Sequence, residues 1–302
     1  MKNIIIKTGI FLLPVIILAL VFETMLRRIP NEYSYKNQYM LQHADSIQVL
    51  VLGSSHGYLD LNPAYLPPHT FNAALSSQSI DYDLQILQKY DTSWKSLKYI
   101  VLPVSYFTLF SNLSEAGEYW RVKYYMLYYQ FHSSHKFNEY TEILCGSLEL
   151  NLRRLIRYYL LRRPVVGCDS NGWAIPFPVN QDVAASGFEG ARKHRVANLQ
   201  KLYPAHKAIL EEIIAFAKKK NARVLFFTAP AYSTYYNNLE PKQLALTLST
   251  MSELVSQNSN TSYYNFLRDS SFTLSDFYDG DHLNGVGAEK MSKKIDSLLR
   301  RN

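Results

Sequence analysis

The chain alternates between short β-branched runs and amphipathic segments, and this alternation restricts its possible folds more than any other feature. Strand-like runs are predicted at 47–53, 70–75, 97–105 and 222–230, with a less regular fifth run at 261–267. Helical spacing of apolar residues marks 81–90, 205–221 and 284–301, and Asn221 is a stop signal at the end of the second. Strands that alternate with helices favour a parallel sheet covered on both faces.

Composition narrows the class of protein further. The 302 residues are 47% hydrophobic, which suits a large buried core and excludes a disordered chain. The net charge of +7 is moderate, and only one arginine cluster stands out, so no nucleic-acid partner is expected. Cys145 and Cys168 can pair or stay reduced, and their spacing is not that of a zinc site.

The N-terminal segment 1–29 is predicted to anchor the chain in a membrane. The run from Asn3 to Phe22 reaches the length of a membrane-spanning helix if Lys7 extends to the interface. A cleaved signal peptide and a buried soluble helix are the alternatives, but "ALVFETM" is a poor cleavage site. A short tail before a single anchor would place the rest of the chain outside the cytoplasm. Residues 30–45 are expected to form a linker.

The remaining residues, 46–302, are predicted to form one α/β domain with an insertion at about 108–200. We expect this insertion to act as a lid or cap rather than as a separate folding unit. His132 and His135 within it can bind a metal, although a surface role is favoured. An arginine-rich face can meet lipid phosphates or an anionic glycan, or can simply be solvated. It comprises Arg153, Arg154, Arg157, Arg162 and Arg163.

A reactive serine is predicted directly after the first strand. Gly53-x-Ser55-x-Gly57 matches the pattern of a nucleophile that follows a strand. Functional side chains of an open parallel sheet lie beyond the carboxyl ends of its strands, where Ser55 would stand. Glycine and serine are also ordinary turn residues, so a polar loop is the alternative. His56 is expected to serve only as a polar turn residue.

A base and an acid for this serine are predicted near the other end of the sequence. A serine hydroxyl needs a base to remove its proton, and His282 is suited to that role. Asp279 stands three residues earlier and can hold the imidazole in the required tautomer. A metal loop formed by Asp276, Asp279 and Asp281, or an acidic turn without function, are the alternatives.

The order of these residues resembles the SGNH (GDSL-type) hydrolase superfamily. The first block of that family would be Gly53-Ser54-Ser55-His56, and its last Asp-x-x-His block would be 279–282. The resemblance covers about 46–105 and 222–300. It implies a flavodoxin-like three-layer α/β sandwich with about five parallel strands, the catalytic residues Ser55, Asp279 and His282, and no cofactor or metal.

The chain departs from the family pattern after the second and third strands. Ser76 or Ser77 stands where an oxyanion-hole glycine is expected, so the backbone N–H groups of Ser55 and of Ser76 or Ser77 are the predicted donors. The asparagine after the third strand is missing, and Ser105 is the nearest polar residue. Ser105, Tyr232 and Tyr235 are predicted to line the substrate site.

The anchor and the Gly-Ser-Ser opening are similar to the membrane-tethered DltD-type branch of the superfamily. That resemblance implies a bacterial esterase or O-acyltransferase that handles acetyl-type esters of a cell-envelope or exported polysaccharide through an acyl-serine intermediate. A membrane-bound O-acyltransferase is an expected partner, together with membrane lipid around the N-terminal helix. The alternative is a catalytically silent protein of the same fold that binds a glycan or serves as a scaffold for such a transferase.

Overall fold

A computed structural model describes residues 2–132, 134–175 and 182–301. Its residues form two compact units, one of Met1–Gln38 with Glu118–Gly167 and the other of Tyr39–Gly117 with Cys168–Asn302. We call them unit 1 and unit 2. The division differs from the predicted insertion at 108–200, because only 118–167 separates from the α/β unit and joins the N-terminal segment.

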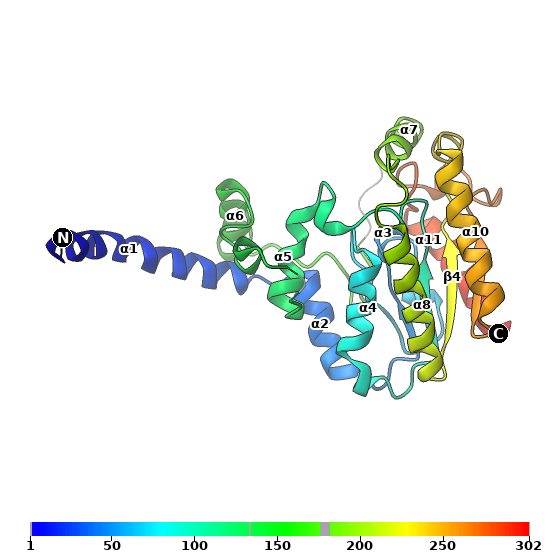
Figure 1. The fold of residues 1–302 in the computed structure, drawn as a ribbon, viewed down its shortest axis with the longest axis horizontal. Helices are drawn as coiled ribbons and strands as arrows, with labels where there is room; N and C mark the ends of the chain where they lie inside the picture. The colour runs from blue at the N-terminus through cyan, green and yellow to red at the C-terminus, as the bar shows by residue number, and fades with distance from the viewer. Residues whose placement is uncertain (1, 133, 176–181, 302) are drawn as a thin grey trace. The chain divides into compact units, whose positions relative to one another are not determined.

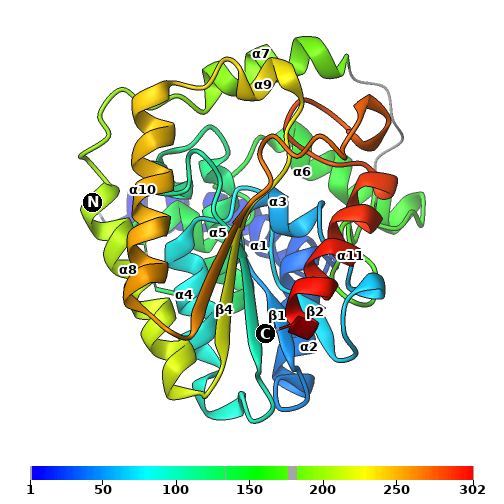
Figure 2. The same ribbon diagram turned by 90° about the vertical axis from the view of Figure 1, so that its right-hand side faces the viewer.

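Unit 2 is built on a five-stranded parallel sheet, as predicted (Figure 2). Its strands are β1 (Val49–Val51), β2 (Thr70–Asn72), β3 (Tyr99–Pro103), β4 (Arg223–Thr228) and β5 (Thr261–Asn265). Their order is β2-β1-β3-β4-β5, which is the flavodoxin-like order of a doubly wound fold. All four strand pairings are parallel, and residues 49–51 are buried on both faces of the sheet, as parallel strands require.

Helices cover both faces of this sheet. Figure 2 shows α4 (Ile80–Lys89), α8 (Tyr203–Lys219) and α10 (Pro241–Gln257) on one face and α11 (Gly285–Arg301) on the other. The apolar stripe of α11 packs against side chains of β1, β3 and β4, and buries Met291, Ile295 and Leu299. Asn221 follows α8 in the left-handed conformation, with φ of 55°, and so ends the helix as predicted.

The shorter elements of unit 2 lie mostly in the connections between strands. They are α3 (Ser55–Tyr58), α7 (Val183–Lys193), α9 (Ser233–Tyr236) and the 3₁₀ turns Pro63–Tyr65, Asp91–Ser93, Leu113–Glu115 and Leu274–Asp276. Helix α7 belongs to unit 2 although the sequence placed it in the insertion. The turn residues after β1, β2 and β3 lie at adjacent strand ends, so the fold gathers them at one edge of the sheet.

Unit 1 is helical. It contains α1 (Lys2–Arg27), α5 (Val122–Tyr124), α6 (Leu148–Leu155), the 3₁₀ turns Tyr119–Arg121 and Phe137–Tyr140, and the π-helical turns Tyr125–Tyr129 and Ile156–Leu160. Helix α2 (Glu32–His43) crosses the boundary between the units and replaces the linker predicted at 30–45. It forms because Tyr33 and Met40 are fully buried, which the polar composition of the segment does not reveal.

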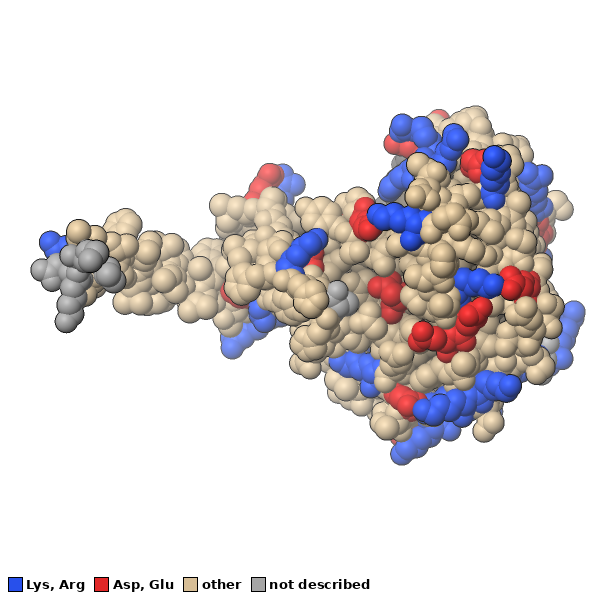
Figure 3. Space-filling model, in the orientation of Figure 1, with Lys and Arg blue, Asp and Glu red and all other residues tan. Residues whose placement is uncertain are grey.

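The stretch Ile6–Arg27 of α1 is long and apolar enough to cross a membrane, by length and composition. Its mean hydropathy reaches 2.4, and most of it is exposed. Figure 1 shows α1 as one continuous helix, and the face of α1 visible in Figure 3 carries no charged side chain over most of its length.

The last turns of α1 are part of the core of unit 1. Leu26 and Ile29 are buried against Leu155. The Glu23 carboxylate accepts hydrogen bonds of 3.0 Å from the backbone N–H groups of Glu142 and Ile143. Residues 22–29 are therefore a structural element of the folded chain.

Candidate active site

Ser55 is the first residue of α3, directly beyond the carboxyl end of β1. The chain turns there at Gly53, whose φ of 102° lies in the region that favours glycine. A Cβ at Gly53 would lie 2.7 Å from Cγ of Pro103 on β3, so a side chain has no room. A Cβ at Gly57 would likewise meet Ala74 at 2.8 Å. The two glycines thus allow the tight strand–turn–helix that presents the half-exposed Ser55 hydroxyl.

Three predicted site residues meet in the structure. Nε2 of His282 lies 2.7 Å from Oγ of Ser55, although 227 positions separate them in the sequence. Nδ1 of the same ring lies 2.9 Å from each carboxylate oxygen of Asp279. One imidazole therefore bridges a serine hydroxyl and a carboxylate at hydrogen-bonding distance, an arrangement that can pass a proton from serine to histidine.

The loop that carries Asp279 and His282 is fixed by its own backbone and by neighbouring elements. Asp279 accepts the backbone N–H of His282 at 2.8 Å and that of Asp281 at 3.0 Å. Gly280 donates to the Ser186 hydroxyl at 2.9 Å and its carbonyl accepts the N–H of Tyr232. These bonds orient the carboxylate toward the imidazole before any substrate binds.

The carboxylates around His282 determine its proton affinity. Burial alone would lower the pKa of His282, but Asp281 and Asp279 outweigh burial and raise the pKa to about 10. Burial would raise the pKa of Asp279, whereas the charge of His282 and its hydrogen bonds hold that pKa well below its usual range. The pair is therefore an ion pair at neutral pH, and the neutral imidazole that a base requires predominates only in alkaline solution.

A second set of histidines and aspartates adjoins this relay. His56, expected to be only a turn residue, is buried and stacks on His282 with ring centroids 4.9 Å apart. Its Nδ1 lies 3.2 Å from Oδ2 of Asp60, and Oδ1 of Asp60 accepts the backbone N–H of Leu283 at 2.9 Å. His56 and Asp60 thus join α3 to the loop that carries His282.

Asp281 lies at the centre of this second set. The residue is 5% exposed, and its Oδ2 accepts no hydrogen bond within the described part of the chain. That oxygen lies 3.8 Å from Nε2 of His56 and 3.6 Å from Nδ1 of His194. Burial lowers the pKa of His194 to about 4, so this ring is neutral at physiological pH. No sequence pattern pointed to His194, because it lies 88 positions before His282 and belongs to no motif.

Two predicted oxyanion donors lie at neighbouring strand ends. The backbone N–H groups of Ser55 and Ser76 have no hydrogen-bond acceptor among the described residues. Leu75 donates to the carbonyl of Gly53 at 3.2 Å, which ties the loop after β2 to the turn before Ser55. Ser77 adopts a positive φ of 59°, a backbone conformation that is uncommon for residues other than glycine. Ser76 or Ser77 stands where the family pattern has a glycine.

Asp83 supports this turn from α4 and was not anticipated. Its Oδ1 accepts the backbone N–H of Gly53 at 2.8 Å and the side-chain amide of Gln78 at 2.6 Å. Burial raises the pKa of Asp83 to about 7. The carboxyl group therefore links the loops after β1 and β2.

The three residues predicted to line the substrate site differ in their burial and in their contacts. Tyr235 is 3% exposed and packs in a core cluster, where its hydroxyl bonds Nδ1 of His194 at 2.9 Å. Ser105 is buried too, and its Oγ has no hydrogen-bond partner among the described residues. Tyr232 is half-buried and packs edge-on against Phe277. For Tyr235, burial argues for a supporting role rather than contact with substrate.

The predicted metal loop does not assemble as a ligand set. Asp276 binds Lys290 at 2.7 Å and caps the turn at Thr273, while Asp279 is bound to His282. Among the described residues, one group has donors close enough to hold a metal ion, and it consists of His56, Asp281 and His282. A metal bound there would compete with Asp279 and Ser55 for the His282 nitrogens.

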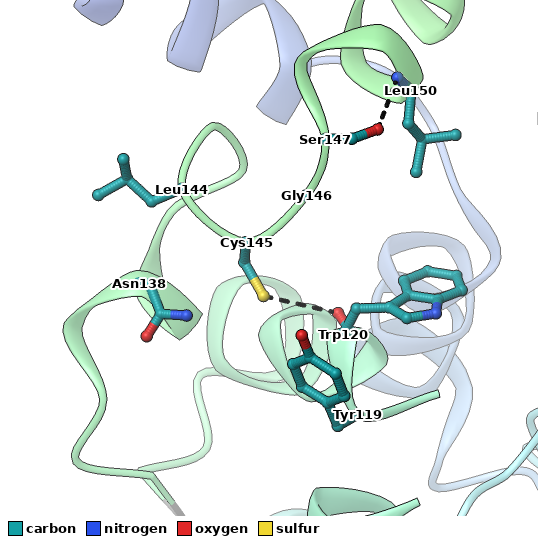
Figure 4. A pocket seen from close by; sticks show the side chains of 8 residues that line it. All are labelled: Tyr119, Trp120, Asn138, Leu144, Cys145, Gly146, Ser147 and Leu150. Carbon is teal, nitrogen blue, oxygen red and sulfur yellow. Dashed lines mark hydrogen bonds between the residues drawn. The ribbon is translucent and has the colours of Figure 1, made fainter. Parts of the chain in front are cut away.

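A cavity lies within unit 1 (Figure 4). It has a volume of about 380 Å³, and none of Ser55, Asp279 and His282 lines it. Its wall includes Cys145, whose thiol lies 3.9 Å from the carbonyl oxygen of Trp120. Cys145 and Cys168 are both buried and are not joined by a disulfide.

Comparison with known proteins gives structural likeness only. No family model and no curated protein sequence matches the chain. A GDSL-like lipase from Bacteroides thetaiotaomicron VPI-5482 is similar with a TM-score of 0.43 and 10% identity, covering 89% of this chain and 98% of that chain. A proposed acylhydrolase from Bacteroides fragilis NCTC 9343 has a TM-score of 0.43 and 9% identity, covering 87% and 95%. Such low identity resolves neither an activity nor a branch of the superfamily.

Proposed function

We propose that this chain is a membrane-anchored serine esterase or O-acyltransferase that works through an acyl-Ser55 intermediate. The observation that carries the proposal is the single imidazole held between Ser55 Oγ, at 2.7 Å, and the Asp279 carboxylate, at 2.9 Å. Serine is a weak nucleophile without such a base.

Each step of the proposed reaction has a group that accepts or returns the proton. Ser55 Oγ attacks the ester carbonyl and its proton passes to Nε2 of His282. The same proton then goes to the leaving alcohol as the ester bond breaks. Water or a carbohydrate hydroxyl attacks the acyl-serine next and gives its proton to His282, which returns it to Ser55. Asp279 stabilises the imidazolium throughout.

The negative oxygen formed in each attack needs hydrogen-bond donors. The backbone N–H groups of Ser55 and Ser76 are suited to this role, because neither is used inside the described structure. Losing one such donor typically costs about 10²–10³ in turnover. The loop after β3 offers no asparagine, so two backbone donors would carry this task.

The proposed substrates are acetyl-type esters of a cell-envelope or exported polysaccharide, and a membrane-bound O-acyltransferase is the proposed partner. The apolar helix α1 supports a site of action at the outer surface of a membrane. The packing of Leu26 and Ile29 in the core of unit 1 favours an anchor that is not cleaved. Removal of 1–29 as a signal peptide would take these two buried side chains out of that core.

Hydrolysis of p-nitrophenyl acetate by the full chain in detergent tests the proposal. Ser55→Ala should lower kcat/KM by about 10⁴-fold or more. Ser54→Ala is the matched control, since Ser54 is the neighbouring serine and its side chain makes no helix-capping hydrogen bond. Equal activity in both variants would contradict the role of Ser55. A folded wild-type chain that hydrolyses neither this ester nor acetylated polysaccharide would favour the silent glycan-binding or scaffold alternative.

A further inference from the structure

Helix α6 and the π-helical turn after it expose an apolar stripe. Four side chains spaced four residues apart form it, and all are exposed: Leu148, Leu152, Ile156 and Leu160. The two ends of the stripe are 71% and 74% exposed. Asn151 and Leu155 on the adjoining face are buried. The segment therefore uses one face for the core of unit 1 and leaves a second apolar face uncovered.

This stripe is continuous with the membrane-exit end of α1. The buried face of α6 packs on Leu26 and Ile29, and the Tyr159 hydroxyl donates to the carbonyl of Met25 at 3.0 Å. Within unit 1, Figure 1 shows α6 running across α1 rather than along it. With α1 spanning a bilayer, a helix that runs across its end would lie near the membrane surface.

Exposed arginines flank the stripe. Arg153 and Arg157 follow Leu152 and Ile156 by one position, and Arg162 and Arg163 follow the π-helical turn. Among the residues that the structure describes, Arg153 alone of these four has an acidic partner, Glu149, and both side chains of that pair are exposed. Apolar side chains beside cationic ones fit the boundary between acyl chains and phosphate groups.

We propose that the segment 148–163 of unit 1 is an interfacial membrane-binding element, with its apolar stripe in the headgroup–acyl boundary and its arginines on lipid phosphates. The inference rests on the proposed retention of α1 and not on catalysis by Ser55. Two membrane contacts, one spanning and one interfacial, would hold unit 1 at a set depth and rotation, whereas a single helix leaves both free.

Spin labels at matched positions test this element. The full chain, with Cys145→Ala and Cys168→Ala, is reconstituted in nanodiscs of phosphatidylethanolamine and phosphatidylglycerol. Single-cysteine variants Leu152→Cys and Ile156→Cys report on the stripe. Leu150→Cys is the control, because it is also exposed but projects from the other side of α6. Oxygen and a water-soluble nickel chelate then measure the surroundings of each label.

At positions 152 and 156, oxygen should relax the label more than the nickel chelate does, and at position 150 the reverse should hold. Water-like values at all three positions would overturn the proposal. Shielding of 152 and 156 from both reagents, with spin–spin broadening that dilution by unlabelled protein removes, would show a second copy on the stripe and also overturn it. Intact mass of the reconstituted protein checks that residues 1–29 are present. Ester hydrolysis, measured separately, reports on Ser55.

Discussion

Removing the charge of Asp281 should move the pH dependence of catalysis without abolishing it. Oδ1 of Asp281 lies 3.7 Å from Nδ1 of His282 and raises the pKa of that imidazole toward about 10. At this separation, and with an effective dielectric constant of about 20, two unit charges interact by about 4 kcal/mol. That energy corresponds to about 3 pKa units, and partial screening leaves an expected shift of about 1–3.

The sign follows from the role of the base. Only the deprotonated imidazole accepts the serine proton, so kcat/KM of the wild-type chain should rise with pH up to about 10. In Asp281→Asn the pKa of His282 falls, and the rising limb should shift to lower pH by about 1–3 units. Activity near pH 7 should therefore increase, while the plateau at high pH changes little.

The assay is kcat/KM for p-nitrophenyl acetate across the pH range, corrected for spontaneous hydrolysis. Asp276→Asn is the matched control, because it is in the same loop but binds Lys290 and should leave the limb in place. Asp279→Asn should instead lower the plateau, by about 10⁴-fold, because the imidazole loses its orienting partner. An unshifted limb in Asp281→Asn would refute the electrostatic reasoning.

Two further predictions concern stability. Gly53→Ala should destabilise unit 2 by about 1–3 kcal/mol, because φ of residue 53 is 102° and the added Cβ would meet Pro103. Thermal unfolding measures this, and Gly117→Ala, which has open space around it, should change the unfolding temperature little. Glu142→Gln should destabilise unit 1 by about 3–5 kcal/mol, because Lys123, 1% exposed and 2.8 Å away, loses its buried partner. Glu149→Gln, which breaks an exposed pair with Arg153, should cost less than about 1 kcal/mol in chemical denaturation, and equal costs for the two glutamates would contradict the account.

The sheet was predictable because parallel strands are buried on both faces and read as apolar runs. The residues at which strands end were less predictable. The run 70–75 stops being a strand at Asn72, whose side-chain amide turns to donate to the carbonyls of Gly57 and Leu61 at 2.7 and 2.9 Å. Helix α2 was missed since its stability comes from burying Tyr33 and Met40, which local polarity conceals.

The residues of the candidate site show the same difference between local sequence patterns and tertiary contacts. Ser55, Asp279 and His282 were identifiable because two short motifs occur in a recognisable order, and the structure brings them within hydrogen-bonding distance. His56 stands beside Ser55, yet its stacking on His282 depends on tertiary structure. His194 directly follows α7 and belongs to no motif, so only the tertiary structure could place it at the site.

The central claim is that His282 and Asp279 activate Ser55, and residue-level mapping of a fluorophosphonate probe tests it most directly. The probe forms a bond to a serine oxygen and releases fluoride, so peptide mass spectrometry identifies the modified residue. The account predicts modification of Ser55 and not of Ser54, with a labelling rate that falls steeply in His282→Ala. Modification of another residue, or labelling of Ser55 at an unchanged rate without His282, would contradict it.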